Sequence, residues 1–340
     1  MNLSQLESFL RAVDTDENLR DVQEPVRQQL DEVRGALRGF FDSSMPIVEK
    51  IGDYIVGVPG KLFRPTLVLL VSGQKGGATP DVIFSATIVE LIHTATLIHD
   101  DTIDRSQLRR GKPTLNAIYD DMAATIVGDF VYTKAFVSLL ERDLRQVLEV
   151  VARTAYRMSL GEMLQIQHRG ALEISEEGYL ELIDCKTASL MSAACEIGAL
   201  STPGGRDEHE RFRDFGRYLG LAYQITDDLF DFVGDSDQLG KVLQSDLEEG
   251  KVTLPLIHAL TQATGPEKRE IKRMLQAPSL QSADWEKVLT ILHRYSGLEY
   301  GRRRALEMAD CARSALAGLK ATPYLKALEQ AVEYAVVRTH

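Results

Sequence analysis

Two copies of an Ile-x-Asp-Asp-x-x-Asp pattern lie inside otherwise apolar stretches of the chain, at residues 98–104 and 225–231. Residues four apart share one face of a helix, so the first and last aspartates of each copy should lie side by side, with the middle one next to them. Two such acidic faces repel themselves unless a cation lies between them. Hard oxygen ligands suit Mg²⁺, which also bridges to substrate phosphates. The six carboxylates belong to Asp100, Asp101, Asp104, Asp227, Asp228 and Asp231.

The residues before each motif distinguish a metal site from a solvated acidic surface. A single Asp-rich stretch is most often a solvated helix face. Here residues 88–98 and 219–225 are apolar nearly all round, which is typical of helices buried inside a bundle. Burying several ionised carboxylates without a metal or a partner raises their pKa values and costs several kcal/mol each. We therefore predict that both motifs together form one metal site.

A magnesium site of this kind implies a phosphorylated substrate, whose charge must be neutralised by basic side chains. One basic group is the pair Lys61 and Arg64, and a second pair, Arg109 and Arg110, follows closely after the first acidic motif. Arginine binds phosphate oxygens bidentately and lysine adds a point charge. Such clusters alone are more often solubilising surface, but a place directly behind a carboxylate triad favours an anion site. Lys186 lies in an otherwise apolar stretch, where it either serves the site or extends its amine to the surface.

The composition limits the class of protein and its partners. The chain has 340 residues and a formal net charge of −11, which disfavours nucleic acid or an anionic membrane as a general partner. Its three cysteines, Cys185, Cys195 and Cys311, are scattered singly, as expected for reduced thiols. The first residues lack a basic region followed by an apolar one, and no apolar run looks long enough to span a bilayer. We expect a soluble, cytoplasmic protein without stable membrane insertion.

Most of the chain shows helical periodicity. Long segments without proline cover residues 84–108, 115–144, 147–167, 176–200 and 208–232. Ser175, followed by two glutamates, fits a helix N-cap. Residues 54–58 and 66–71 are compatible with strands, but they do not alternate with helices in the βαβ manner. The Gly- and Pro-containing breaks are short, so we predict one all-α helical bundle in a single domain.

Further motifs follow one another in a specific order. Beside the two Asp-rich motifs stand GKLFRP at 60–65, RRGKPT at 109–114, GEMLQ at 161–165, Lys186-Thr187, Tyr223-Gln224 and GKVTLP at 250–255. In this order and spacing they resemble the trans-isoprenyl diphosphate synthases, or polyprenyl synthetases. The resemblance implies an all-α prenyltransferase domain with a deep central cavity, usually a homodimer. That domain would span residues 1–340, with the motif-bearing core at about 60–255, N-terminal helices in 1–59 and C-terminal helices in 256–340.

The resemblance also implies roles for the residues that match the family's motifs. The six aspartates would hold a magnesium cluster, expected to contain three ions, on an allylic diphosphate. The residues implied to bind that diphosphate or face its developing cation are Arg109, Lys186, Thr187, Gln224, Lys241 and Lys251. Those implied to hold isopentenyl diphosphate are Lys61, Arg64, His93 and Arg110. One departure is Gln244, where family members usually have Gly, so the conformation of the Gly240–Asp246 loop and the role of Lys241 do not follow from the family.

The implied reaction is a magnesium-dependent, head-to-tail condensation of isopentenyl diphosphate with an allylic diphosphate, and we expect that primer to be farnesyl or geranylgeranyl diphosphate. Ala95 and Thr96, five and four residues before Asp100, match the family's product ruler, where short-chain relatives carry aromatic side chains. Small residues at these positions predict a long-chain all-trans product. The residues expected along the path of its tail are Ile92, Met122, Ile126 and Met163.

Three other functions are compatible with parts of the sequence. A farnesyl or geranylgeranyl diphosphate synthase, with a shorter product, would share the motifs. A class I terpene cyclase needs only one diphosphate pocket, whereas two Asp-rich motifs with two basic groups favour two diphosphates. A catalytically silent partner subunit tends to lose motif aspartates or arginines, and none is missing here.

Overall fold

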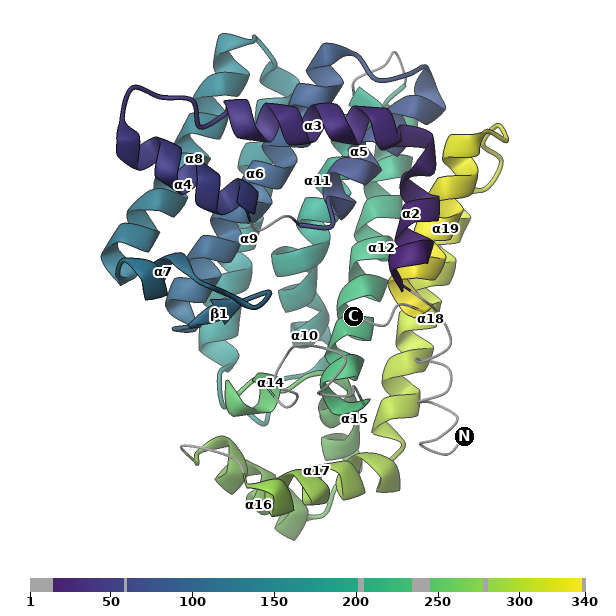
Figure 1. Ribbon diagram of the computed structural model, residues 1–340. Coiled ribbons are helices and arrows are strands. Elements are labelled where there is room, and N and C mark those ends of the chain that lie inside the picture. The colour runs from purple at the N-terminus through teal and green to yellow at the C-terminus, as the bar shows by residue number, and fades with distance from the viewer. Residues whose placement is uncertain (1–14, 58–59, 201–204, 234–244, 278–280, 338–340) are drawn as a thin grey trace.

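The computed structural model describes residues 15–57, 60–200, 205–233, 245–277 and 281–337, and these residues are almost entirely helical (Figure 1). The long helices at the centre pack against one another and confirm the predicted all-α fold. They are α5 (Phe63–Lys75), α6 (Pro80–Ile103), α8 (Asp121–Glu141), α9 (Arg145–His168), α11 (Ser189–Leu200) and α12 (Arg206–Val233).

Other helices cover the ends and one side of this central bundle (Figure 1). The N-terminal elements, purple in Figure 1, are α2 (Thr15–Gln23), η1 (Glu24–Val26), α3 (Arg27–Gly39) and α4 (Pro46–Gly57). The C-terminal elements are α15 (Leu254–Gln262), α16 (Gly265–Leu275), α17 (Ser282–Arg294), α18 (Gly297–Leu316) and α19 (Pro323–Val337). Helix α18 packs along α12, so the C-terminal part of the chain supports the helix that carries the second acidic motif.

Helix α6 carries the first acidic motif at its C-terminal end. It begins where Thr79 caps the helix by accepting a hydrogen bond from the Val82 amide, and its middle is apolar all round and buried. The helix ends at Ile103, and a short hairpin follows, in which β1 (Leu108–Arg109) pairs with β2 (Lys112–Pro113). Arg110 and Gly111 at its turn both have positive φ, as a type I′ turn requires. The helix predicted to continue to residue 108 is therefore too long.

Two further predictions of element boundaries need correction. Residues 66–71, compatible with a strand, lie inside α5, and residues 54–57 lie inside α4. The predicted helix over 115–144 is divided into α7 (Leu115–Ile118) and α8, because Asp120 caps a new helix by accepting from the Ala123 amide. The predicted N-cap at Ser175 is confirmed, since its hydroxyl accepts from the Gly178 amide and α10 (Glu176–Ile183) follows.

Glycines let helix α11 approach its neighbours closely. A Cβ added to Gly198 would lie 2.5 Å from the Val68 carbonyl oxygen of α5, and one added to Gly216 of α12 would lie 2.5 Å from the Met191 carbonyl oxygen of α11. Distances this short forbid any side chain at either glycine. Helix α11 is thus pressed between α5 and α12, which fixes the segment before it, where Lys186 and Thr187 stand.

Among the described residues, two helices are long and apolar enough to cross a membrane by length and composition, contrary to the expectation that no run would be. They are α6 and α8, with 61% and 33% of an apolar 18-residue segment of each buried inside the structure. Core helices of soluble proteins pass the same test, so this finding is weak evidence for a membrane span.

Candidate active site

The first acidic motif faces the hairpin that follows it. Asp101 is only 6% exposed and accepts three hydrogen bonds of 2.7 to 2.9 Å from the Arg109 guanidinium. Arg109 stands on β1, so the hairpin brings the arginine back over the end of α6. Burial raises the pKa of Asp101, and the Arg109 guanidinium opposes this rise. Asp101 is therefore held by a strong, forked contact within the protein.

Asp100, in the last turn of α6, and Asp104, which follows the end of that helix, face cations from later parts of the chain. Asp100 Oδ2 lies 3.6 Å from Lys186 Nζ, and Asp104 Oδ1 accepts a hydrogen bond of 3.1 Å from Arg169 Nη2. Burial raises the pKa of Asp100 to about 6, against the effect of Lys186, and Glu162 and Asp104 add to the rise. The raised pKa means that nearby positive charge does not fully compensate this carboxylate.

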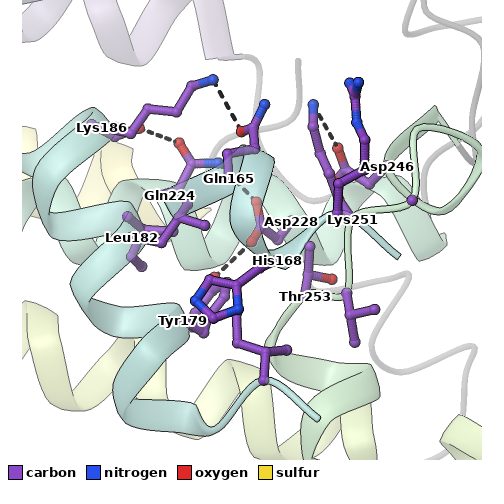
Figure 2. A pocket seen from close by; sticks show the side chains of 16 residues that line it. Gln165, His168, Tyr179, Leu182, Lys186, Gln224, Asp228, Asp246, Lys251 and Thr253 are labelled. Carbon is purple, nitrogen blue, oxygen red and sulfur yellow. Dashed lines mark hydrogen bonds and ion pairs between the residues drawn. The ribbon is translucent and has the colours of Figure 1, made fainter. Parts of the chain in front are cut away.

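The second acidic motif is held by a chain of hydrogen bonds (Figure 2). Asp228 on α12 accepts from the Tyr179 hydroxyl at 2.6 Å and from the Gln224 side-chain amide at 2.7 Å. The Gln224 carbonyl oxygen accepts in turn from the Thr187 hydroxyl at 2.7 Å. Burial and the nearby Asp246 raise the pKa of Asp228 well above its ordinary value. Both oxygens of Asp228 thus have protein partners, and the orientation of the Gln224 amide is fixed.

Lys186 points into the site and not out to the surface. Its Nζ lies 2.6 Å from Glu162 Oε1, 3.0 Å from Gln165 Oε1 and 3.6 Å from Asp100 Oδ2. Glu162 and Gln165 belong to α9 and Asp100 to α6, so this amine links two helices of the bundle. Figure 2 shows its contact with Gln165. The sequence allowed the amine of Lys186 to lie either in the site or at the surface, and in the structure it lies in the site.

Lys251 pairs with acidic residues of its own segment, after α12, and lines a pocket together with Asp228 of the second motif. Its Nζ pairs with Glu249 and lies 3.9 Å from Asp246 Oδ1. Burial lowers the pKa of Lys251, but Asp246, Glu249 and Asp104 together raise it above its ordinary value. Lys251 lines the same pocket as Lys186 and Asp228, and Lys186 also faces Asp100, so the two acidic motifs lie at one cavity.

A second basic group surrounds His93 on α6. Arg64 Nη1 lies 3.1 Å from His93 Nε2, and a guanidinium has only donors, so Nε2 is the acceptor and the ring proton is on Nδ1. Burial and the charges of Arg64, Arg110 and Arg109 lower the pKa of His93 well below its ordinary value. The imidazole is therefore neutral at physiological pH and has one N–H left to donate.

One acid, Glu90, lies within this basic group, a turn before His93. It is only 7% exposed, and burial raises its pKa although the nearby arginines oppose the rise. A Cβ on Gly60 would lie 2.9 Å from Glu90 Oε1 and 3.3 Å from Arg110 Nη1. The segment that begins at Gly60 and continues with Lys61 thus meets Glu90 and Arg110 closely. Of the residues predicted to hold isopentenyl diphosphate, Arg64, His93 and Arg110 lie together here, and Lys61 follows Gly60 directly in the chain.

The predicted ruler residues lie on α6 before the acidic motif. Ala95 is fully buried, as is Ile92, and Thr96 is half-buried. The other residues expected along the tail path are 60 to 70% exposed on the single chain, so they do not line an enclosed passage within it; they are Met122, Ile126 and Met163.

The remaining predicted residues follow the second motif. Asp227 and Asp231 lie one turn apart on α12, and Asp231 Oδ2 accepts a hydrogen bond of 3.3 Å from the Asp246 amide. Lys241 and Gln244 lie outside the described residues, so the role predicted for Lys241 stays a prediction.

The acidic groups of the site fit Mg²⁺ by charge and by donor type. Carboxylate oxygens are the hard ligands that this ion prefers, and the raised pKa of buried Asp100 indicates a shortage of positive charge that a divalent cation would supply. Within the described part of the chain, no three His, Cys, Asp or Glu side chains already converge as a metal site. Mg²⁺ keeps several waters and uses one or two carboxylates together with substrate phosphates, so a fully formed protein cage is not required.

Four residues of the site were not singled out from the sequence. Glu162 belongs to the GEMLQ motif, and Glu90 is a lone acid in an apolar stretch, so each carried a signal. Tyr179 lies 49 residues before Asp228, and periodicity gives no reason to pair them. The same holds for Arg169, which meets Asp104 across the cavity.

The chain is similar to known proteins over nearly its whole length. A family model described as polyprenyl synthetase matches residues 45–292. The octaprenyl diphosphate synthase of Escherichia coli (strain K12) is 37% identical over 324 residues, which cover 94% of this chain and 99% of that protein. These matches confirm the resemblance that the motifs indicated.

Solved structures agree with the sequence matches. A decaprenyl diphosphate synthase from Rhodobacter capsulatus has a TM-score of 0.88 at 32% identity, covering 96% of this chain and 100% of its own. A polyprenyl synthase from Caulobacter crescentus CB15, in complex with calcium and isoprenyl diphosphate, also has a TM-score of 0.88 at 32% identity, with coverages of 94% and 98%. On this evidence the chain belongs to the polyprenyl synthetase family of chain-elongating trans-prenyltransferases.

Proposed function

We propose that this enzyme extends farnesyl or geranylgeranyl diphosphate by repeated condensation with isopentenyl diphosphate, giving a long-chain all-trans polyprenyl diphosphate. The observation that carries the proposal is the presence of two separate cationic groups beside one acidic cavity. Lys186 and Lys251 lie at the acidic motifs, and Arg64 and Arg110 surround His93. Two cationic groups suit two diphosphates, and the small side chain of Ala95, five residues before Asp100, supports a long product.

The chemistry demands positive charge around the leaving group. Breaking the allylic carbon–oxygen bond leaves a carbocation and a diphosphate, so preorganised cations lower the barrier as charge separates. Mg²⁺ held by the two acidic motifs, for which we propose three ions, would stabilise the charge of the leaving diphosphate. Lys186 and Lys251 bind the same diphosphate from the protein side. Because water would capture the cation, the burial of both motifs protects the intermediate.

The second substrate supplies the electrons of the new bond. We assign Arg64, Arg110 and Lys61 to its diphosphate, with the Nδ1–H of neutral His93 as a further donor. The double bond of isopentenyl diphosphate attacks the carbocation, a carbon–carbon bond forms, and one proton is lost. We assign the departing diphosphate as the base that takes this proton. The product is again an allylic diphosphate, so the cycle repeats until the tail meets a barrier.

We propose that the enzyme is a homodimer joined through the apolar faces of α8 and α9. The exposed residues are spaced at helical intervals along one face of each helix, and each is at least 56% exposed; they are Met122, Ile126 and Leu140 on α8, and Tyr156, Met163 and Ile166 on α9. Soluble monomers rarely expose so large an apolar patch, whereas obligate dimer interfaces are apolar. A second copy of the chain is the occupant that the family resemblance favours.

Light scattering after size exclusion tests the dimer. We expect the wild type to have about twice the mass of one chain, 37.9 kDa, and Ile126→Glu to shift towards the monomer. Glu286→Gln, which changes an exposed charge on α17 in the C-terminal part of the chain, is the control. A monomeric wild type, or one that binds lipid vesicles through the same face, would overturn the assignment.

The function is tested with purified protein, Mg²⁺, labelled isopentenyl diphosphate and either farnesyl or geranylgeranyl diphosphate. After dephosphorylation, the products are separated by length. We expect a ladder that ends at a long-chain polyprenol. A product that stops at geranylgeraniol from farnesyl diphosphate would overturn the long-chain assignment, and no elongation with any allylic primer would overturn the function itself.

A further inference from the structure

Lys186 and Thr187 stand on a turn of unusual geometry. Between α10 and α11 the helix widens into the π-helical segment η2 (Asp184–Ala188). Single π turns are rare in α-helices and are found mostly at functional sites, because they re-aim side chains at some cost in stability. Lys186 and Thr187 reach the first acidic motif and Gln224 only from this turn, so whatever holds the turn also sets their positions.

Asp184, the first residue of the turn, forms ion pairs with arginines on two different helices. It is only 8% exposed, and each of its oxygens accepts a charge-assisted hydrogen bond from a different helix. Arg157 Nη2 of α9 donates to Oδ2 at 2.8 Å, and Arg217 Nε of α12 donates to Oδ1 at 2.9 Å. The carboxylate therefore ties the turn to the two helices between which it lies.

Each of these two helices also has a glycine that packs against the turn, about one helical turn after its arginine. Gly161 follows Arg157 by one turn of α9, and a Cβ there would lie 2.8 Å from the Lys186 backbone nitrogen. Gly220 follows Arg217 by about one turn of α12, and a Cβ there would lie 2.5 Å from the Ala188 Cα. On each helix, the same face therefore carries an arginine that binds Asp184 and a glycine that lets the π turn pack closely.

We propose that Asp184 is a positioning residue for the allylic diphosphate site. Its two ion pairs hold the π turn between α9 and α12, so that Lys186 Nζ and Thr187 Oγ1 stay aimed at the acidic cavity. The partners of Lys186 and Thr187 are Glu162, Gln165, Asp100 and Gln224. The hydrogen bonds of Asp184 go to other residues, Arg157 and Arg217. This inference rests on the proposed function, because it assigns the turn to the binding of one substrate. Arg64 and His93 lie on α5 and α6, away from these ion pairs, so the site for isopentenyl diphosphate should be unaffected.

The test compares Asp184→Asn with a control at a neighbouring ion pair. Asparagine keeps the size of the side chain but removes the charge and one acceptor. The control, Glu196→Gln, weakens the ion pair of 3.3 Å between Arg153 of α9 and Glu196 of α11, one turn away from Arg157. We expect Asp184→Asn to raise the KM for farnesyl diphosphate on the order of tenfold and to lower kcat, because small displacements of binding groups have large effects. The KM for isopentenyl diphosphate should stay within about twofold, and Glu196→Gln should change neither.

Hydrogen exchange of the backbone amides measures directly how firmly the π turn is held. If Asp184 holds it, the amides of residues 184–188 exchange faster in Asp184→Asn than in the wild type or in Glu196→Gln. Unchanged exchange, unchanged kinetics, or equal rises in both KM values would overturn the proposal. If the wild type does not elongate any primer, the proposed function fails separately. The inference is then decided by calorimetric binding of inorganic diphosphate with Mg²⁺, where unchanged affinity in Asp184→Asn overturns it and a loss on the order of tenfold supports it.

Discussion

Replacing Ala95 with phenylalanine should shorten the product if this position limits the growing tail. Ala95 lies five residues before Asp100 on α6, which is about 7.5 Å along the helix axis. The tail of a diphosphate bound at Asp100 would therefore meet a new aromatic ring after a short stretch of chain. We expect products of Ala95→Phe to end at a much shorter length than those of the wild type.

The cost in stability depends on what surrounds the side chain. Ala95 is fully buried, and enlarging a residue in a packed core costs about 1–3 kcal/mol. No open space borders Ala95 in the described part of the folded chain, so Ala95→Phe should carry this cost as well. Ala86, nine residues earlier on α6 and also fully buried, points to about the opposite side of the helix, because each residue turns the helix by about 100°. Ala86→Phe is therefore a control that should lose stability without changing product length.

The assay separates labelled products by length for the wild type and both variants, and urea unfolding measures their stability. The expected pattern is short products for Ala95→Phe and normal products for Ala86→Phe, with a loss of stability in both variants. Ala95→Phe with unchanged product length and a loss of about 1–3 kcal/mol would mean that this side chain packs in the core and does not limit the tail.

Three further outcomes test other parts of the site. Tyr179→Phe removes the hydroxyl that donates to Asp228, so a magnesium titration of activity should show a half-maximal concentration raised on the order of tenfold; an unchanged value would mean that Asp228 needs no such support. Arg109→Lys keeps the charge but cannot form the forked contact with Asp101, so kcat/KM for the allylic substrate should fall on the order of tenfold in steady-state assays, and full activity would refute the need for the fork. Because the pKa of His93 in the folded chain lies well below 6.5, only the unfolded chain gains a proton there as the pH falls through this value. The wild type should therefore lose more stability than His93→Gln between about pH 7 and 5, measured by urea unfolding, and equal losses would contradict the buried neutral ring.

The sequence was sufficient to predict the helices and the residues that lie on them at fixed spacing. An apolar segment before Asp100 indicated a buried helix, and spacing alone placed Asp104 one turn further on the same face. Lys186 in an apolar stretch was recognised as unusual, but its direction stayed open until Glu162 and Gln165 of α9 were seen around its amine. Local pattern carries this information because the helix repeats it every turn.

What the sequence did not predict depends on contacts between distant segments. The break after Ile103 follows from a hairpin turn whose positive φ values at Arg110 and Gly111 leave little trace in an amphipathic pattern. The π turn at Asp184 is fixed by arginines 27 and 33 residues away, on two other helices. Helical periodicity assumes a regular repeat, so it cannot indicate where tertiary contacts widen the helix by one residue.

The charges of the cavity are arranged in pairs that suit an exchange of partners. In the chain as it stands, Lys186 lies against Asp100 and Glu162, and Arg169 binds Asp104. A magnesium diphosphate carries both kinds of partner, since its metal suits the carboxylates and its oxygens suit the lysine and arginine. Each buried charge that gives up a protein partner can therefore gain one from the ligand, and no carboxylate or amine is left uncompensated in a medium where that would be costly. This balance explains how six motif aspartates can lie so close to the core of a stable helical bundle.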